Sequence, residues 1–123
     1  MTQATQPNSV AAAKAHDRNK ARTDRRLICE MVARMGIEGC SDDDLARNIP
    51  SLNPNSIRLR RGDLTDKQRS GGYEGPRFIT DHLGLRKKSS SGMSVTAWHI
   101  TAAGLRALGM DPETTWQADK AAP

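Results

Sequence analysis

Apolar residues recur three and four positions apart between Leu27 and Met35, which is the spacing of one helical face. This repeat predicts a helix over residues 23–35, and Gly36 supplies a residue at which such a helix readily ends. The preceding residues 1–22 have no periodic apolar positions and carry scattered lysines and arginines. We therefore expect residues 1–22 to form a flexible basic arm, either solvated or lying along a DNA groove.

Two shorter helices are predicted after the first, over residues 42–49 and 54–68. Ser41 can cap the earlier one, because its hydroxyl oxygen can accept a hydrogen bond from an N–H group of the first turn. Asn53 and Pro54 supply an N-cap and a first helical residue whose missing N–H costs nothing. A short helix, a tight connection and a basic second helix are the arrangement of a helix-turn-helix.

The second half of the chain contains two stretches of strand composition with a basic, serine-rich segment between them. Residues 77–80 (RFIT) are rich in strand-forming types, and residues 93–100 (MSVTAWHI) alternate between two faces. Together they predict a hairpin with a basic tip, the shape called a wing. We expect Trp98 and Ile100 to point into the core, and the link at residues 38–40 to add a short strand that pairs with the hairpin.

The C-terminal part of the domain is predicted to be a helix that Thr101 caps and Gly109 ends. A short final helix carrying Trp116 is expected after it, and the tail from Gln117 is expected to be loose. The fold class is then α+β, mainly helical with a small β-hairpin wing. The chain divides into a flexible arm (1–22), one domain (23–109) and a short helix with a loose tail (110–123).

Positive charge is concentrated in one part of the chain, although the whole chain has a net charge of only +5. Residues 54–106 carry ten lysines and arginines against four aspartates and glutamates, a net charge of +6. Lysines and arginines at phosphates release condensed counterions, so a polyanionic partner is the natural inference for this segment. The alternative is an ordinary solvated surface in an arginine-rich protein.

Several classes of protein find little support in the sequence. No apolar run approaches the ~20 residues of a membrane span, and the N-terminus lacks a signal-peptide pattern, so a cytoplasmic protein with no membrane partner is expected. Cys29 and Cys40 lack the short spacing of zinc ligands, and we expect Cys29 to be a small buried apolar residue. Helix capping accounts for residues 42–44 (DDD), and no catalytic motif is present. We therefore expect no metal, no cofactor and no enzymatic activity.

Two strings of the sequence resemble winged helix-turn-helix proteins, especially the small MarR-like ones of bacteriophages and other mobile elements. Residues 52–64 (LNPNSIRLRRGDL) look like a recognition helix, and residues 97–108 (AWHITAAGLRAL) resemble the strand-to-helix ending of that domain. The resemblance covers about residues 23–109. It implies binding to double-stranded DNA, usually in transcriptional control and often as a homodimer.

Two departures from that family are visible in the sequence. The usual short apolar link from recognition helix to wing is replaced by a longer, glycine-rich segment, RSGGYEGPRFI (69–79). The long terminal helices through which larger MarR-like proteins dimerise are not predicted here, which leaves that mode of dimerisation unsupported by the sequence.

The residues predicted to contact DNA lie on the second helix of the helix-turn-helix and on the wing. A helix that enters the major groove presents its first two turns to base edges, where arginine can grip guanine and asparagine can grip adenine. Wing cations would contact the backbone or the minor groove, which positions the protein without reading much sequence. The predicted residues are Asn53, Asn55, Ser56, Arg58, Arg60 and Arg61 at the helix over 54–68, and Arg86, Lys87 and Lys88 on the wing over 86–92.

Two interpretations of these residues stay open at this point. In the first, the chain is a sequence-preferring transcriptional regulator of the phage or mobile-element type. In the second, the same fold docks on a protein, such as a polymerase or a replication or recombination assembly. The basic helix is then a solvated face and the wing a plain charged loop. Arg61 has its own alternatives, lying flat against the core or reaching a phosphate.

Overall fold

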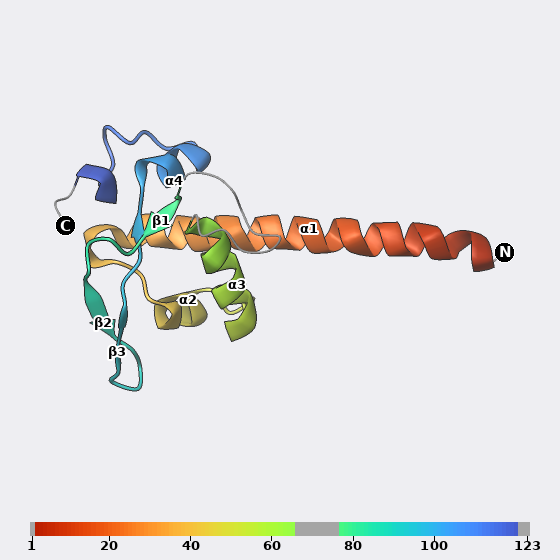
Figure 1. Ribbon diagram of the computed structural model, residues 1–123, viewed down its shortest axis with the longest axis horizontal. Coiled ribbons are helices and arrows are strands. Elements are labelled where there is room, and N and C mark those ends of the chain that lie inside the picture. Colours follow the sequence, from red (N-terminus) through yellow and green to blue (C-terminus); the bar gives the residue numbers. More distant parts are fainter. Residues whose placement is uncertain (1, 66–76, 121–123) are drawn as a thin grey trace.

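The computed structural model of the chain describes residues 2–65 and 77–120, with side chains from residue 15 onward. Its longest element is helix α1 (Thr2–Met35), whose C-terminal end packs against the other elements while its N-terminal part projects away from them (Figure 1). The expectation of a helix start at Thr23 is therefore wrong, and the arm expected over 1–22 is helical from Thr2. Residues 10–22 contain five alanines and neither glycine nor proline, so intrinsic propensity favours a helix there without any apolar face.

Two helices follow close to the predicted positions, α2 (Asp42–Asn48) and α3 (Pro54–Leu64). The hydroxyl of Ser41 accepts a hydrogen bond from the N–H of Asp44, whose carboxylate in turn accepts one from the N–H of Ser41, which is a complete capping box. The N-caps predicted at Ser41 and at Asn53 are therefore confirmed.

Helix α3 ends earlier than residue 68, the predicted end. Thr65 has left the helical conformation, and its hydroxyl donates a hydrogen bond to the carbonyl of Gly62 at 2.9 Å. The same carbonyl also accepts the N–H of Thr65 at 3.3 Å, so the backbone and the side chain of Thr65 together close the last turn of α3. Residues 66–68, the remainder of the predicted helix, lie outside the described residues.

Four short strands form two small antiparallel sheets. Strand β1 (Ile79–Thr80) pairs with β4 (His99–Ile100), and β2 (Arg86–Lys88) pairs with β3 (Ser94–Thr96). The second pair forms the hairpin that descends below α1 in Figure 1, and we call it the β2–β3 hairpin. Its basic segment was expected in the tip. The structure instead places residues 86–88 in a strand, so their side chains alternate between two faces.

The strand predicted over 93–100 is interrupted between β3 and β4. At the interruption Trp98 pairs with Cys40, through two backbone hydrogen bonds of 2.8 Å. The short extended link that was expected beside the hairpin is thus confirmed as a single bridge. The residues before it form a 3₁₀ turn, η1 (Gly36–Glu38), and Gly36 takes the positive φ of 58° that a helix end favours.

The C-terminal segment packs on the domain rather than hanging loose. Helix α4 (Ala102–Ala107) is capped by Thr101, as predicted. The expected helix around Trp116 is replaced by turns and a 3₁₀ segment, η2 (Ala118–Lys120). Gln117 is buried, and the ring of Trp116 lies 5.5 Å from that of His99. The prediction of a loose tail is therefore wrong as far as Lys120, and residues 121–123 lie outside the described residues.

The core is small and aliphatic, and residues of α1, α2, α3 and α4 all contribute to it. Trp98 and Ile100 point into it as predicted, and Cys29 is buried as a small apolar residue. Gly104 allows α4 to approach β1 closely, because a Cβ atom there would lie 2.3 Å from the carbonyl oxygen of Phe78. The architecture is thus a small α+β fold of three main helices followed by small antiparallel two-stranded sheets. No helix among the described residues is long and apolar enough to cross a membrane.

Candidate nucleic-acid interface

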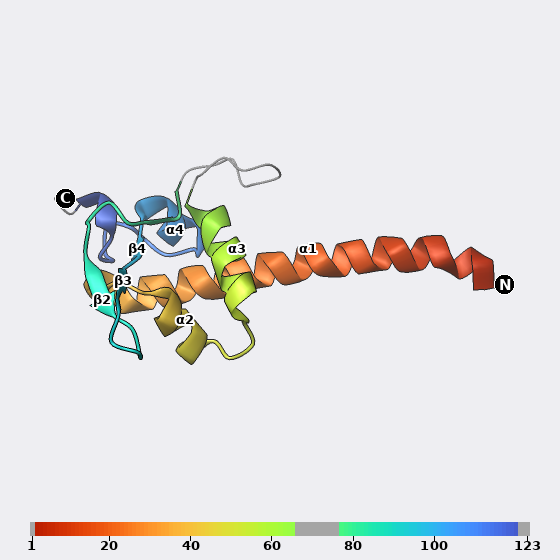
Figure 2. The ribbon, with the colours of Figure 1, turned by 60° about the horizontal axis from the view of Figure 1, so that its bottom comes forward.

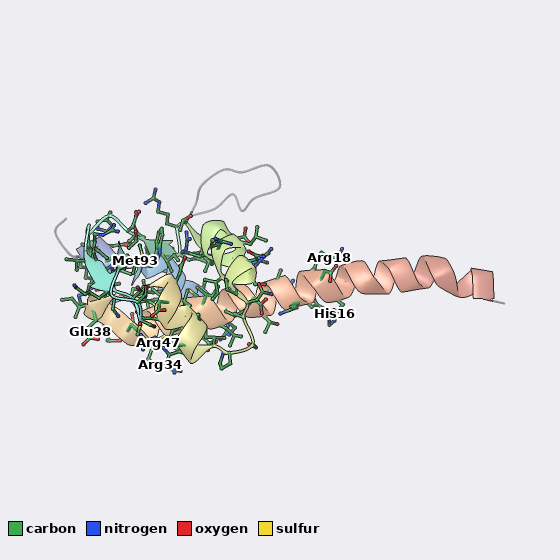
Figure 3. All side chains as sticks on the ribbon, turned by 90° about the horizontal axis from the view of Figure 1, so that it is seen from below. His16, Arg18, Arg34, Glu38, Arg47 and Met93 are labelled. Carbon is green, nitrogen blue, oxygen red and sulfur yellow. The ribbon has the colours of Figure 1, made fainter. Side chains whose placement is uncertain are left out.

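The N-terminal end of α3 and the tip of the β2–β3 hairpin lie on the same side of the molecule, with α2 between them (Figures 1 and 2). Figure 3 looks onto this side, where Met93 of the hairpin and Arg47 of α2 are labelled. His16 and Arg18 lie apart from it, on the projecting part of α1. This side therefore contains both segments that the sequence singled out for DNA contact.

One face of α3 is exposed, and we call it the outer face of α3: Asn55, Arg58 and Leu59. The opposite face buries Ile57 and Leu64 in the core. Helical geometry explains why these exposed residues share one face. Residues three or four positions apart lie one above the other, and Arg58 and Leu59 follow Asn55 by three and four positions. The expected exposure of Asn55 and Arg58 is therefore confirmed.

Arg58 and Asn55 are joined by a hydrogen bond. The guanidinium donates from Nη2 to Oδ1 of the Asn55 amide at 2.7 Å, and no carboxylate within the described ranges pairs with Arg58. The Asn55 amide N–H groups have no partner among these residues either. Both side chains consequently present N–H donors, which suit the acceptor atoms of phosphates and of guanine.

The other two predicted residues at the start of α3, Asn53 and Ser56, take part in the structure of the helix itself. The exposed Asn53 uses its side-chain oxygen to accept the N–H of Ser56 at 2.8 Å, which caps the helix. Ser56 itself is half-buried, on the flank of α3 rather than on its outer face.

Arg60 turns toward α1 instead of the outer face. Its guanidinium donates to the Asp63 carboxylate at 2.9 Å, and Arg25 of α1 donates to the same carboxylate oxygen at 3.3 Å. Only 23% of the Arg60 side chain is exposed. Asp63 thus shares its charge between two arginines and joins α3 to α1.

Arg61 takes the first of its two expected positions, flat against the core. Its guanidinium lies 4.9 Å from the centre of the Trp98 ring, where the negative face of the indole attracts a cation. It also donates two hydrogen bonds to Asp42, at 2.8 and 2.9 Å, in the forked geometry that arginine makes with carboxylates. Arg61 therefore fixes α3 against α2 and the strand region.

Lys87 lies on the inner face of the β2–β3 hairpin. Its ammonium group is 2.7 Å from the Asp44 carboxylate and donates to the carbonyl of Gly39 at 3.0 Å. Burial alone would raise the pKa of Asp44. The pairing with Lys87 and the hydrogen bonds from Ser41 outweigh burial and hold that pKa below its ordinary value. Lys87 is thus committed to an internal ion pair.

Arg86 and Lys88 occupy the outer face of the same strand and are exposed. Arg86 donates to the hydroxyl and the carbonyl of Ser94 across the hairpin, at 2.8 and 2.9 Å. The side chain of Lys88 has neither an ion pair nor a hydrogen bond with any described residue. Two of the three predicted wing cations are therefore directed to solvent, as the alternation of a strand requires.

The three aspartates at the start of α2 do more than cap it, which sequence reasoning missed. Asp44 completes the capping box and pairs with Lys87, while Asp42 binds Arg61. Asp43 accepts hydrogen bonds from the N–H and hydroxyl of Ser90 at the hairpin tip, at 2.8 to 3.1 Å. The sequence held a signal, since one carboxylate suffices for a capping box and three are present.

A hollow of about 380 Å³ separates the flank of α3 from the β2–β3 hairpin. It is lined by Asp42 and Asp43 of α2, by Arg61 and Trp98, and by Arg86 and residues 94–96 of the hairpin. The aspartates of α2 thus join both neighbours to α2, since Asp42 binds Arg61 of α3 while Asp43 and Asp44 bind the hairpin.

Other groups of chemical interest are buried away from this side. Burial raises the pKa of the Cys29 and Cys40 thiols to about 12, which removes their thiolate character at neutral pH. His99 has its Nε2 3.1 Å from the carbonyl oxygen of Ile37, and burial lowers its pKa. Within the described ranges no three His, Cys, Asp or Glu side chains gather in a way that could hold a metal ion.

Comparison of the chain with known protein families, with curated protein sequences and with solved structures finds no match.

Proposed function

We propose that this chain is a winged helix-turn-helix protein that binds double-stranded DNA and regulates transcription with some sequence preference, as phage and mobile-element regulators do. In this proposal α2 and α3 are the helix-turn-helix, α3 enters the major groove, and the β2–β3 hairpin is the wing. The protein acts by binding and not by catalysis. It takes no cofactor, and a second copy of the chain or a transcription protein is a further partner compatible with this role.

The observation that carries the proposal is the division of cations on one side of the molecule. Arg58 of α3 and Arg86 and Lys88 of the hairpin have no carboxylate partner within the described part of the chain. The neighbouring cations Arg61 and Lys87 are neutralised by aspartates of α2. An interface for phosphates needs cations that are held in place by the fold but are not neutralised by a carboxylate. Arg58, Arg86 and Lys88 meet both requirements.

The proposed roles follow from these positions. Arg58 and Asn55 meet base edges, because they lie on the outer face in the first two turns of α3. Arg86 and Lys88 contact phosphates and hold the register. Arg60, Arg61 and Lys87, which the sequence placed among the DNA contacts, act as positioning residues through their ion pairs.

A salt series of duplex-binding constants tests the proposal. We expect Lys88→Ala to weaken binding to specific and random duplexes about equally, and to lower the salt slope by roughly one ion. Arg58→Ala should lose discrimination between a selected and a random duplex. Arg106→Ala is the matched control, since Arg106 is exposed on α4, on the opposite side of the molecule (Figure 1). Equal effects of all three substitutions, or none, would contradict the proposal.

A second candidate function is a protein-docking module for a polymerase, replication or recombination assembly. It is favoured by the apolar side chains that the same side exposes, Leu59 at 55% and Met93 at 66%. A gel shift with random duplex at low salt separates the two functions, because a DNA-binding protein retards the duplex and a pure adaptor does not.

A further inference from the structure

We propose that Leu59 reads the C5-methyl group of a thymine in the major groove, next to a base pair that Arg58 contacts. The inference depends on the proposed function, because it assigns a base preference to the same outer face of α3. Leu59 has no charge and no side-chain hydrogen-bonding group, so it was not among the residues predicted to contact DNA.

Leu59 is unusually exposed for a large apolar residue. It is 55% exposed in the second turn of α3, whereas the other leucine of that helix, Leu64, is 3% exposed. Nothing in the packing of the core requires an apolar residue at an outward position of a short, arginine-rich helix. A large apolar side chain at such a position gains free energy only when a partner covers it.

The neighbours of Leu59 on the outer face of α3 are polar. Asn55 lies one turn earlier on the same face, and Arg58 is hydrogen-bonded to the Asn55 amide oxygen. The outer face of α3 therefore combines a cluster of N–H donors with a single apolar contact. A protein-docking surface would call for several apolar residues side by side, and α3 exposes one large apolar side chain among its eleven residues.

The major groove of DNA presents groups that match both Leu59 and Arg58. The thymine methyl is the apolar group that base edges present in the major groove, and leucine can cover it. Guanine presents the two acceptors O6 and N7, which match the donors of Arg58. Leu59 and Arg58 are adjacent in the sequence, so the proposal predicts a thymine beside a guanine contact within the preferred site.

The experiment uses the full chain and a duplex selected by it from a random library. Each dT of that duplex is replaced in turn by dU, which lacks only the methyl group. We expect one replacement to weaken binding about fourfold, the effect of about one buried methyl group. Leu59→Ala should bind the dT duplex more weakly and be insensitive to the same replacement. Leu85→Ala, which shortens another exposed leucine outside α3, should keep the fourfold difference.

The outcomes separate this inference from the proposed function. A wild-type chain that binds the selected duplex but tolerates dU at every position overturns the inference and leaves DNA binding in place. The same holds if Leu59→Ala keeps the full penalty for dU, or if selection returns no preferred sequence. A chain that binds no duplex at low salt overturns both. Circular dichroism of the two leucine variants confirms that each is folded.

Discussion

Two sets of cations, equal in number and interleaved in the sequence, have opposite surroundings in this molecule. The first set is paired with carboxylates, and the second is directed to solvent. The paired set is Arg60, Arg61 and Lys87, and the solvent-directed set is Arg58, Arg86 and Lys88. Residue type and sequence neighbourhood are nearly the same in both.

The difference arises from the periods of the two elements. Successive helical residues differ by about 100° in direction, so Arg58 and Arg60 lie on different sides of α3. Successive strand residues point to opposite faces, so Lys87 lies inward between two outward neighbours. The basic residues therefore do not act as one site. The paired set stabilises α3 and the β2–β3 hairpin, and the solvent-directed set is exposed on these two elements.

The largest expected effect concerns the paired set. Asp44→Asn removes the charge that Lys87 faces, and 5% of the Asp44 side chain is exposed. We expect a loss of about 2–4 kcal/mol in the free energy of unfolding, because a partly buried ammonium group is left without its partner and the capping box is weakened. Urea denaturation measures it. Asp43→Asn, whose partners Ser90 and Arg47 are exposed, should cost less than about 1 kcal/mol. Equal costs would contradict the division between the sets.

The next effect contrasts one member of each set on α3. Arg58→Ala should lower the affinity for a selected duplex about tenfold relative to a random one, which is the effect of one good base contact. Arg60→Ala should change that ratio less than about twofold, because its guanidinium is held by Asp63. Fluorescence anisotropy with both duplexes measures the ratio. A larger effect of Arg60→Ala would mean that the ion pair opens on DNA.

The sequence predicted the local features of the fold well. The caps at Ser41, Asn53 and Thr101 depend on residues three positions away, and all three are present. The start of α1 was missed because a projecting helix has no apolar face for periodicity to detect. The pairing of residues 38–40 with the hairpin was expected, but the break between β3 and β4 was missed because the alternation over 93–100 does not show where β3 ends and the bridge of Trp98 to Cys40 begins.

In the candidate site, too, local features were predictable from the sequence and distant contacts were not. Helical spacing places Asn55 and Arg58 outward, and the structure agrees. The partner of Arg61 lies nineteen positions away, and no local pattern reveals such a contact. The pair of Arg60 with Asp63 is different, since a separation of three on a helix is a recognisable spacing for an ion pair.

A smaller effect is expected from releasing a paired cation without removing it. Asp63→Asn frees Arg60 and Arg25, whose side chains then meet phosphates more readily. We expect duplex affinity at low salt to rise about threefold, with a steeper salt slope. Asp119→Asn in η2 makes the same change in net charge away from α3, and it should raise affinity less. Equal gains for the two variants would show that net charge, and not the release of these arginines, is responsible.

The smallest expected effect concerns the buried His99, which belongs to neither set of cations. It tests whether burial alone keeps a side chain uncharged. Burial lowers the pKa of His99 by more than the hydrogen bond to the Ile37 carbonyl raises it, and the electrostatic interactions with His82 and Lys87 also lower it. The unfolded chain then takes up a proton at His99 that the folded chain resists. Stability from this group is therefore complete above pH 6.5 and falls as the pH drops below that value. The pKa of Asp44 is also lowered, but the stability that its charge provides is lost only below pH 3.8. The pH ranges over which His99 and Asp44 affect stability are therefore separate. Urea denaturation between pH 5 and 7 should show a shallow slope that His99→Gln removes and His16→Gln keeps. A slope that survives His99→Gln would assign the proton uptake to another group.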